Sequence, residues 1–113
     1  MKKSISKKSS HILIKLSGVI SQEDVRELKN LLSSNSKYSL PVILDIRQAK
    51  SVHYKTGLLL KGMRKYFLSR CIPLTIICTD PYTLSVLSLF DSEVMYDTTK
   101  NLNSARNLVE IKF

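Results

Sequence analysis

A chain of 113 residues is long enough for one domain with a hydrophobic core, and a hydrophobic content of 43% excludes a disordered chain. The formal net charge of +9 indicates an anionic partner (nucleic acid, a membrane surface or an acidic protein) or a solvated basic tail. Four of the 18 lysine and arginine residues lie among the first eight residues, which favours the tail.

Cysteine usage and the amino-terminal sequence bear on the compartment. Cys71 and Cys78 do not form a Cys-x-x-Cys motif, and a domain with a full core gains little from one disulfide. The basic start lacks a signal-peptide core because the apolar residues 12–14 are followed at once by Lys15. No apolar run approaches the ~20 residues of a membrane span. We therefore expect a cytoplasmic protein with reduced, buried thiols.

The first third of the chain predicts a strand followed by a helix. Residues 1–10 contain only Ile5 as a side chain to bury, so they are expected to be a flexible basic tail or at most an edge strand. Apolar residues alternate over residues 11–16, which is typical of a strand. Ser21 is the expected N-cap of a helix, with Asp24 three residues later as in a capping box.

The rest of the chain continues this alternation of strands and helices. Residues 42–46 are apolar on both faces, as in a central strand, and Pro41 fits only at its start. A polar crossing over residues 48–55 then leads to a helix that opens at Thr56. The later predicted elements are a strand over residues 74–78, a helix opened by Asp80 and Pro81, a short strand over residues 94–96, and a final helix capped by Thr99 or Asn101. This order predicts a single α/β domain over residues 11–113, with a small, mainly parallel sheet and about four helices.

Three segments carry a pattern that a known family shares. Residues 14–20 form a strand followed by Gly-x-hydrophobic, residues 42–46 form an apolar strand with one Asp near its end, and residues 55–58 read Lys-Thr-Gly-Leu. Their order and spacing resemble the STAS domain, the fold of bacterial anti-sigma-factor antagonists and of sulfate-transporter tails. The last segment falls where that family usually has Asp-Ser-Ser/Thr-Gly-Leu. The resemblance covers roughly residues 11–110, and it implies a mixed, mainly parallel sheet.

The resemblance implies a regulatory role without catalysis. In the antagonists, the second hydroxyl of the motif is phosphorylated by a partner kinase that also binds a sigma factor, and Thr56 matches this position. An anti-sigma-factor-like kinase or another signalling protein is the implied partner. Two features depart from the family: Tyr54 and Lys55 replace the Asp and the first hydroxyl, and Ser21 replaces an acidic residue that often starts the first helix. A divergent switch and a module that binds without phosphorylation both remain open.

Thr56 also has a physical case of its own. We expect it on the surface at the mouth of the helix, where a phosphate would meet free N–H groups and the positive end of the helix dipole. Lys55 and Lys61 would add charge-assisted contacts. The alternative is a plain N-cap that contributes about 1 kcal/mol. Gly57 has a structural alternative too, because a glycine lets another segment approach closely.

A basic helix face is the second candidate surface. The cationic side chains of this face are Lys55, Lys61, Arg64 and Lys65. They would suit an acidic protein surface, and the alternative is a solvated helix face. Nucleic acid is a weaker partner because no aromatic side chains interleave with these charges. Tyr54 is a possible interface anchor. The predicted partner-binding residues are Ser21, Tyr54, Lys55, Gly57, Lys61 and Arg64.

The remaining polar residues do not predict an enzyme. Asp45 is expected at the end of a strand, where it could contact a ligand or tether the loop over residues 47–55. His11 and His53 share no ligand spacing with cysteine or carboxylate, and neither cysteine has a histidine in a recognisable arrangement. There is no glycine-rich phosphate loop. We therefore expect no metal, no cofactor and no catalysis.

Overall fold

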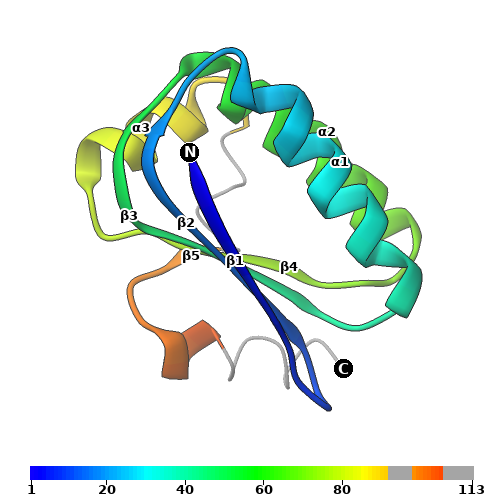
Figure 1. The fold of residues 1–113 in the computed structure, drawn as a ribbon. Coiled ribbons are helices and arrows are strands. Elements are labelled where there is room, and N and C mark those ends of the chain that lie inside the picture. The colour runs from blue at the N-terminus through cyan, green and yellow to red at the C-terminus, as the bar shows by residue number, and fades with distance from the viewer. Residues whose placement is uncertain (92–97, 106–113) are drawn as a thin grey trace.

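A single sheet organises the chain. The computed structural model describes residues 1–91 and 98–105, and in this part the sheet has the order β1-β2-β3-β4-β5 (Figure 1). Its strands are β1 (Lys2–Lys7), β2 (Ile12–Ile20), β3 (Val42–Val52), β4 (Leu74–Ile77) and β5 (Thr98–Thr99). Its helices are α1 (Asp24–Asn35), the 3-10 turn η1 (Ser36–Tyr38), α2 (Tyr54–Ser69) and α3 (Pro81–Ser88), followed by a helical segment over residues 102–105. Only β1 is antiparallel to its neighbour, which confirms the predicted mixed, mainly parallel α/β class.

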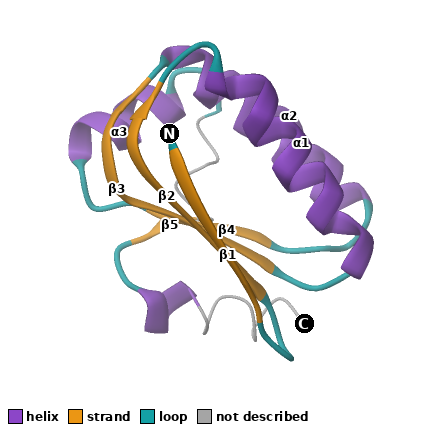
Figure 2. Cartoon of the chain, viewed as in Figure 1, coloured by secondary structure: helices purple, strands orange, loops and turns teal. Residues whose placement is uncertain are grey.

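The two faces of the sheet are covered unequally. The main core lies between the sheet and the helices α1 to α3, and a second, smaller cluster lies on the opposite face with the segment over residues 102–105 (Figure 2). Because successive side chains of a strand point to opposite faces, β3 sends Leu44 into the first cluster and Ile43 into the second. Both residues are fully buried, which explains why this strand reads as apolar on both faces.

The amino-terminal lysines belong to the sheet. The sequence left open a tail or an edge strand, and the structure has β1 paired with β2 from Lys2 opposite Ser17 to Lys7 opposite Ile12. The sequence of this strand shows no alternation of apolar and polar residues, because the outermost strand has few apolar side chains to bury.

Strand β3 is longer than predicted. Residues 48–52 continue the strand instead of forming a crossing, because β2 also continues and pairs with them as far as Ile20 opposite Val52. The pairing slips between Lys15 and Ser17, as at a β-bulge. The side chains of Arg47 and Gln48 are exposed, so the polarity of this stretch reflects an open sheet face and not a loop.

Helix α1 begins three residues after the predicted cap. Its first residue is Asp24, whose carboxylate accepts hydrogen bonds from the backbone N–H of Ser21 (2.9 Å) and from its hydroxyl (3.0 Å). The acidic half of a capping box is therefore present, whereas the Ser21 hydroxyl donates instead of accepting. The backbone hydrogen bond from Ser21 holds the pKa of Asp24 below its usual value.

The later helix starts agree with the sequence. Asp80 accepts from the N–H groups of Tyr82 (3.4 Å) and Thr83 (3.2 Å), and Pro81 opens α3. Asn101 accepts from the N–H of Ser104 (2.8 Å). The predicted strand over residues 94–96 and the later part of the final helix lie outside the described residues.

The described residues contain no helix that is both long enough and apolar enough to cross a membrane. Within the same ranges, no three histidine, cysteine or acidic side chains group in a way that could hold a metal ion. Both cysteines are free thiols, and Cys78 is buried as expected, whereas the expected burial of Cys71 is wrong because its side chain is exposed.

Candidate protein-binding site at the start of α2

The candidate site lies at the edge of the sheet where β2 and β3 end. These parallel strands lead into the starts of α1 and α2, and the N–H of His53 donates to the carbonyl of Ile20 (2.9 Å). The turn at Ser21 and the first turn of α2 are thereby brought together at one end of the molecule (Figure 1).

The first turn of α2 differs from the prediction in its cap. The helix begins at Tyr54, and the ring Nδ1 of His53 accepts a hydrogen bond from the N–H of Lys55 (3.2 Å). Thr56 is therefore not the N-cap but the third residue of the helix, and its N–H donates to the carbonyl of His53 (2.9 Å). Sequence reasoning missed His53 because histidine is not among the preferred capping residues.

Thr56 is buried, so its predicted position on the surface is wrong. Its exposed fraction is 2%, and its hydroxyl oxygen has no hydrogen-bond partner in the part of the chain that the structure describes. Leaving a buried hydroxyl without a partner costs about 1–3 kcal/mol. The structure therefore places an energetically unfavourable polar group at the position that matches the phosphorylated hydroxyl of the antagonists.

Gly57 is buried beside Thr56 and has a packing role. A Cβ atom at this position would lie 2.9 Å from the carbonyl oxygen of Val86 and 3.3 Å from the Cα of Leu87. The close approach that the sequence left as an alternative is thus observed, and the approaching segment is the end of α3. A buried Gly57 contributes no surface to a partner in this conformation.

An apolar patch lies exposed next to this packed turn. We name it the α2 patch and define it by Tyr54, Leu58 and Phe90, whose exposed fractions are 50%, 53% and 37%. The rings of Tyr54 and Phe90 have their centroids 6.3 Å apart, so α2 and the segment that follows α3 both contribute. Leu58 follows Tyr54 by four residues and lies on the same helix face. Sequence reasoning named Tyr54 as a possible anchor but missed Leu58 and Phe90. Leu58 lies beside the buried stripe of α2, whereas the spacing of Phe90 from Leu87 predicts an inward-facing residue that the structure instead leaves exposed.

The predicted basic face is divided. Arg64 forms an ion pair with Asp91, and its side chain is largely buried. Lys55 and Lys61 are half-buried, and Lys65 is exposed. A partner would therefore meet lysines on α2, whereas Arg64 ties the chain after α3 to the helix.

Asp45 lies within β3 and not at a strand end. Its carboxylate accepts hydrogen bonds from the backbone N–H (3.1 Å) and from the side-chain Nε (3.0 Å) and Nη2 (2.8 Å) of Arg47. Burial acts to raise the pKa of Asp45, but the hydrogen bonds from Arg47 outweigh it and hold that pKa below its usual value. Asp45 therefore does act as a tether, but it holds the continuing strand at Arg47 and not a loop.

Comparison with known proteins identifies the fold through structure alone. No protein-family model and no curated protein matches the sequence. An anti-sigma factor antagonist from Mycobacterium paratuberculosis matches with a TM-score of 0.81 at 12% identity, over 96% of this chain and 93% of that one. The unphosphorylated anti-sigma factor antagonist SpoIIAA matches with a TM-score of 0.80 at 12% identity, over 96% of both chains.

A third structure extends the likeness to another protein. A variant of RsbS from Moorella thermoacetica matches with a TM-score of 0.80 at 14% identity, over 98% of this chain and 97% of that one. These likenesses confirm the resemblance that three short segments of the sequence suggested. The chain has the STAS fold of the anti-sigma factor antagonists.

Proposed function

We propose that this domain is a regulatory protein-binding module that exchanges partners and that its partner is an anti-sigma-factor-like kinase or a related signalling protein. The single observation that carries the proposal is the α2 patch. Half-exposed Tyr54 and Leu58 lie beside the buried residue that matches the family's regulated hydroxyl. Aromatic and aliphatic anchors of this kind contribute much of the affinity of protein interfaces. The fold shared with anti-sigma factor antagonists supports the class of partner.

In the conformation described, binding proceeds without modification of Thr56. A phosphate carries about −1.5 to −2 charges and needs water or cationic partners. Thr56 is 2% exposed and lies next to Gly57, whose Cα has no room for even a methyl group facing α3. Buried Thr56 thus favours an interaction module that binds in its unphosphorylated state.

A switch through Thr56 is the second candidate, and one observation favours it. The hydroxyl of Thr56 has no hydrogen-bond partner among the described residues and lies in the first turn of a 16-residue helix, where N–H groups and the helix dipole attract an anion. Phosphorylation would require the first turn of α2 to open, because the Thr56 side chain is buried. SpoIIAA has been solved in unphosphorylated and phosphorylated forms, and this chain matches them with TM-scores of 0.80 and 0.75.

A matched pair of substitutions on α2 tests the leading proposal. Leu58→Ser removes an anchor of the α2 patch, whereas Leu68→Ser changes a leucine that is 76% exposed at the far end of the same helix. With a purified anti-sigma-factor-type kinase from the same genome, we expect Leu58→Ser to weaken binding about tenfold and Leu68→Ser to leave it unchanged. Equal affinities of the two variants in calorimetry would contradict the α2 patch as the binding surface.

The same kinase separates the two candidates. Incubation with ATP, followed by mapping of phosphate by mass spectrometry, should leave Thr56 unlabelled if the domain is an unphosphorylated module. In that case Thr56→Val should bind as the wild type does. Phosphate on Thr56 in the wild type and its absence in Thr56→Val would favour the switch. Lys61→Glu is the suitable charge-reversal variant in either case, because Arg64 already has an acidic partner.

A further inference from the structure

The outer edge of β1 presents backbone groups that the sheet does not use. Within the described chain, β1 is the end strand and pairs only with β2. The N–H of Lys8 donates to the carbonyl of His11 (2.8 Å), which makes the next pair, Lys7 and Ile12, a non-hydrogen-bonded pair. Hydrogen-bonded and non-hydrogen-bonded pairs alternate along an antiparallel ladder. The N–H and C=O groups of Lys3, Ile5 and Lys7 therefore point away from β2.

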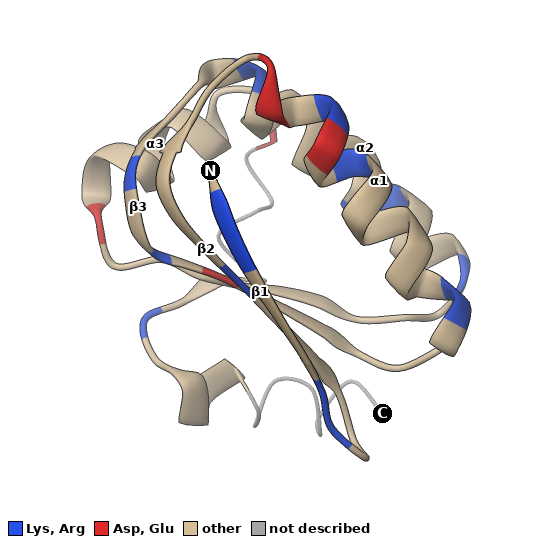
Figure 3. Cartoon of the chain, viewed as in Figure 1, with Lys and Arg blue, Asp and Glu red and all other residues tan. Residues whose placement is uncertain are grey.

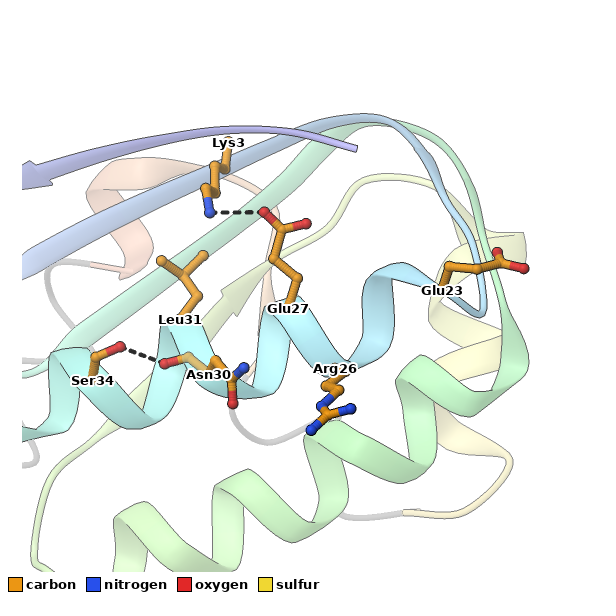
Figure 4. Close-up of a pocket in the computed structure, with 7 residues that line it drawn as sticks. All are labelled: Lys3, Glu23, Arg26, Glu27, Asn30, Leu31 and Ser34. Atoms are coloured by element: carbon orange, nitrogen blue, oxygen red, sulfur yellow. Dashed lines mark hydrogen bonds and ion pairs between the residues drawn. The ribbon is translucent and has the colours of Figure 1, made fainter.

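A groove lies beside the Lys3 end of this edge. It has a volume of about 490 Å³ and lies between β1 and α1 (Figure 4). Lys3 reaches across it and forms an ion pair with Glu27 of α1 at 2.8 Å. The residues that line the groove are Lys3, Glu23, Arg26, Glu27, Asn30, Leu31 and Ser34. An additional strand on β1 would thus have α1 beside it and would not project into solvent on both faces.

The charge along β1 is entirely positive. Lysines lie at both ends of the strand and in the turn that follows it (Figure 3). Among the described residues, Lys2, Lys7 and Lys8 form no ion pair. The ammonium of Lys7 lies instead 3.9 Å from the ring centroid of Tyr38. Carboxylates at alternate positions of an added strand would find cations directly across or diagonally opposite.

A second copy of this chain fits the edge poorly. Antiparallel self-pairing through the three outward residues places Ile5 opposite Ile5 of the other copy. The same register places Lys3 of each copy opposite Lys7 of the other, and Lys2 of each copy opposite Lys8 of the other. Like charges directly opposite destabilise a strand pair, and lysine is a residue that protects edge strands against self-association. The lysines that repel another copy are those that attract an acidic strand.

The geometry points to β1 as a docking edge for an extended, acidic segment of a partner protein, which adds to the sheet as a further strand. The backbone of Lys3, Ile5 and Lys7 supplies the hydrogen bonds, and the lysines select the charge of the segment. This surface is separate from the α2 patch, so a module that binds one partner at α2 can engage a second at β1.

A designed peptide tests the proposal on the full chain. The probe is a fluorescein-labelled peptide in which glutamate alternates with valine, and its control has lysine in place of glutamate. In fluorescence anisotropy we expect saturable binding of the glutamate peptide that weakens as salt is raised, and no binding of the lysine peptide. Hydrogen exchange should slow at the amides of Lys3, Ile5 and Lys7 and stay unchanged at those of Ser4 and Ser6, which already bond to β2.

Two substitutions in β1 test whether the peptide binds at this edge. Ile5→Pro removes an outward N–H without removing a hydrogen bond to β2. It should lower the affinity for the glutamate peptide about tenfold. Lys7→Glu should lower this affinity about fivefold, whereas Lys65→Glu, at an exposed position on α2, should leave it unchanged. The proposal is overturned if both β1 variants bind as the wild type does or if the lysine peptide binds equally well. It is also overturned if sedimentation shows a dimer that Ile5→Pro dissociates, because a second copy would then occupy the edge.

Discussion

The first turn of α2 and the outer edge of β1 both contain hydrogen-bonding groups without a partner, but in opposite environments. The Thr56 hydroxyl is enclosed in the first turn of α2, where no described group satisfies it. The backbone groups of Lys3, Ile5 and Lys7 face solvent, where water satisfies them at no cost. A missing partner therefore lowers stability at α2 and leaves an available binding edge at β1.

The largest expected effect is that of a charge at the buried position. Thr56→Glu should lower the free energy of unfolding by about 3–5 kcal/mol, because a carboxylate in this turn is removed from water without a full set of partners. Urea denaturation followed by circular dichroism measures the difference. A loss below about 1 kcal/mol would mean that the turn opens easily. That result would support the phosphorylation switch over the unphosphorylated module.

The edge of β1 should respond to proline according to the direction of each N–H. Ser4→Pro removes a donor that bonds to β2 and should cost about 2–3 kcal/mol. Ile5→Pro removes a donor that faces solvent and should cost about 1 kcal/mol, mainly through lost side-chain packing. Thermal denaturation of both variants provides the comparison. A reversed order would show that the outward residues are the even-numbered ones.

Gly57 and Gly62 form a matched pair on one helix. Gly57→Ala should destabilise by about 1–2 kcal/mol, because its Cβ would meet the backbone of Val86 and Leu87. Gly62→Ala should stabilise by about 0.5–1 kcal/mol, because nothing lies within 4 Å of a Cβ there and alanine favours the helix. Opposite signs in urea denaturation would confirm the close approach of α3, whereas stabilisation by both substitutions would contradict it.

The smallest expected effect is a gain in stability. Thr56→Val keeps the shape of the side chain and removes the hydroxyl without a partner, so it should raise the free energy of unfolding by about 1 kcal/mol. Thr56→Ser keeps the hydroxyl and serves as the control that should show no gain. A loss of stability in Thr56→Val would indicate that the hydroxyl has a partner, and the contrast with the solvent-facing amides of β1 would then fail.

Much of the fold follows from local patterns. The alternation of residues 11–16, the doubly apolar strand around Leu44 and the Asp80 cap each depend on neighbours in the sequence, so they could be predicted. The order of the three short segments was sufficient to suggest the STAS fold, which solved structures at 12–14% identity confirm. Tyr54 was named as a possible anchor because an aromatic side chain exposed beside Thr56 suits an interface.

The environment of the candidate site could not be predicted, because it depends on contacts between segments that are distant in the sequence. Thr56 is buried in a turn whose neighbouring Gly57 packs against α3, about thirty positions later, whereas the sequence shows only a hydroxyl before a helix. Likewise, residues 2–7 and 48–52 become strands because β2 offers each of them a partner. The sequence by itself determined the order of the central strands and of the helices that follow them, because their patterns are local. The tertiary structure decided which of their polar groups meet water, because burial and sheet pairing depend on segments that are distant in the chain.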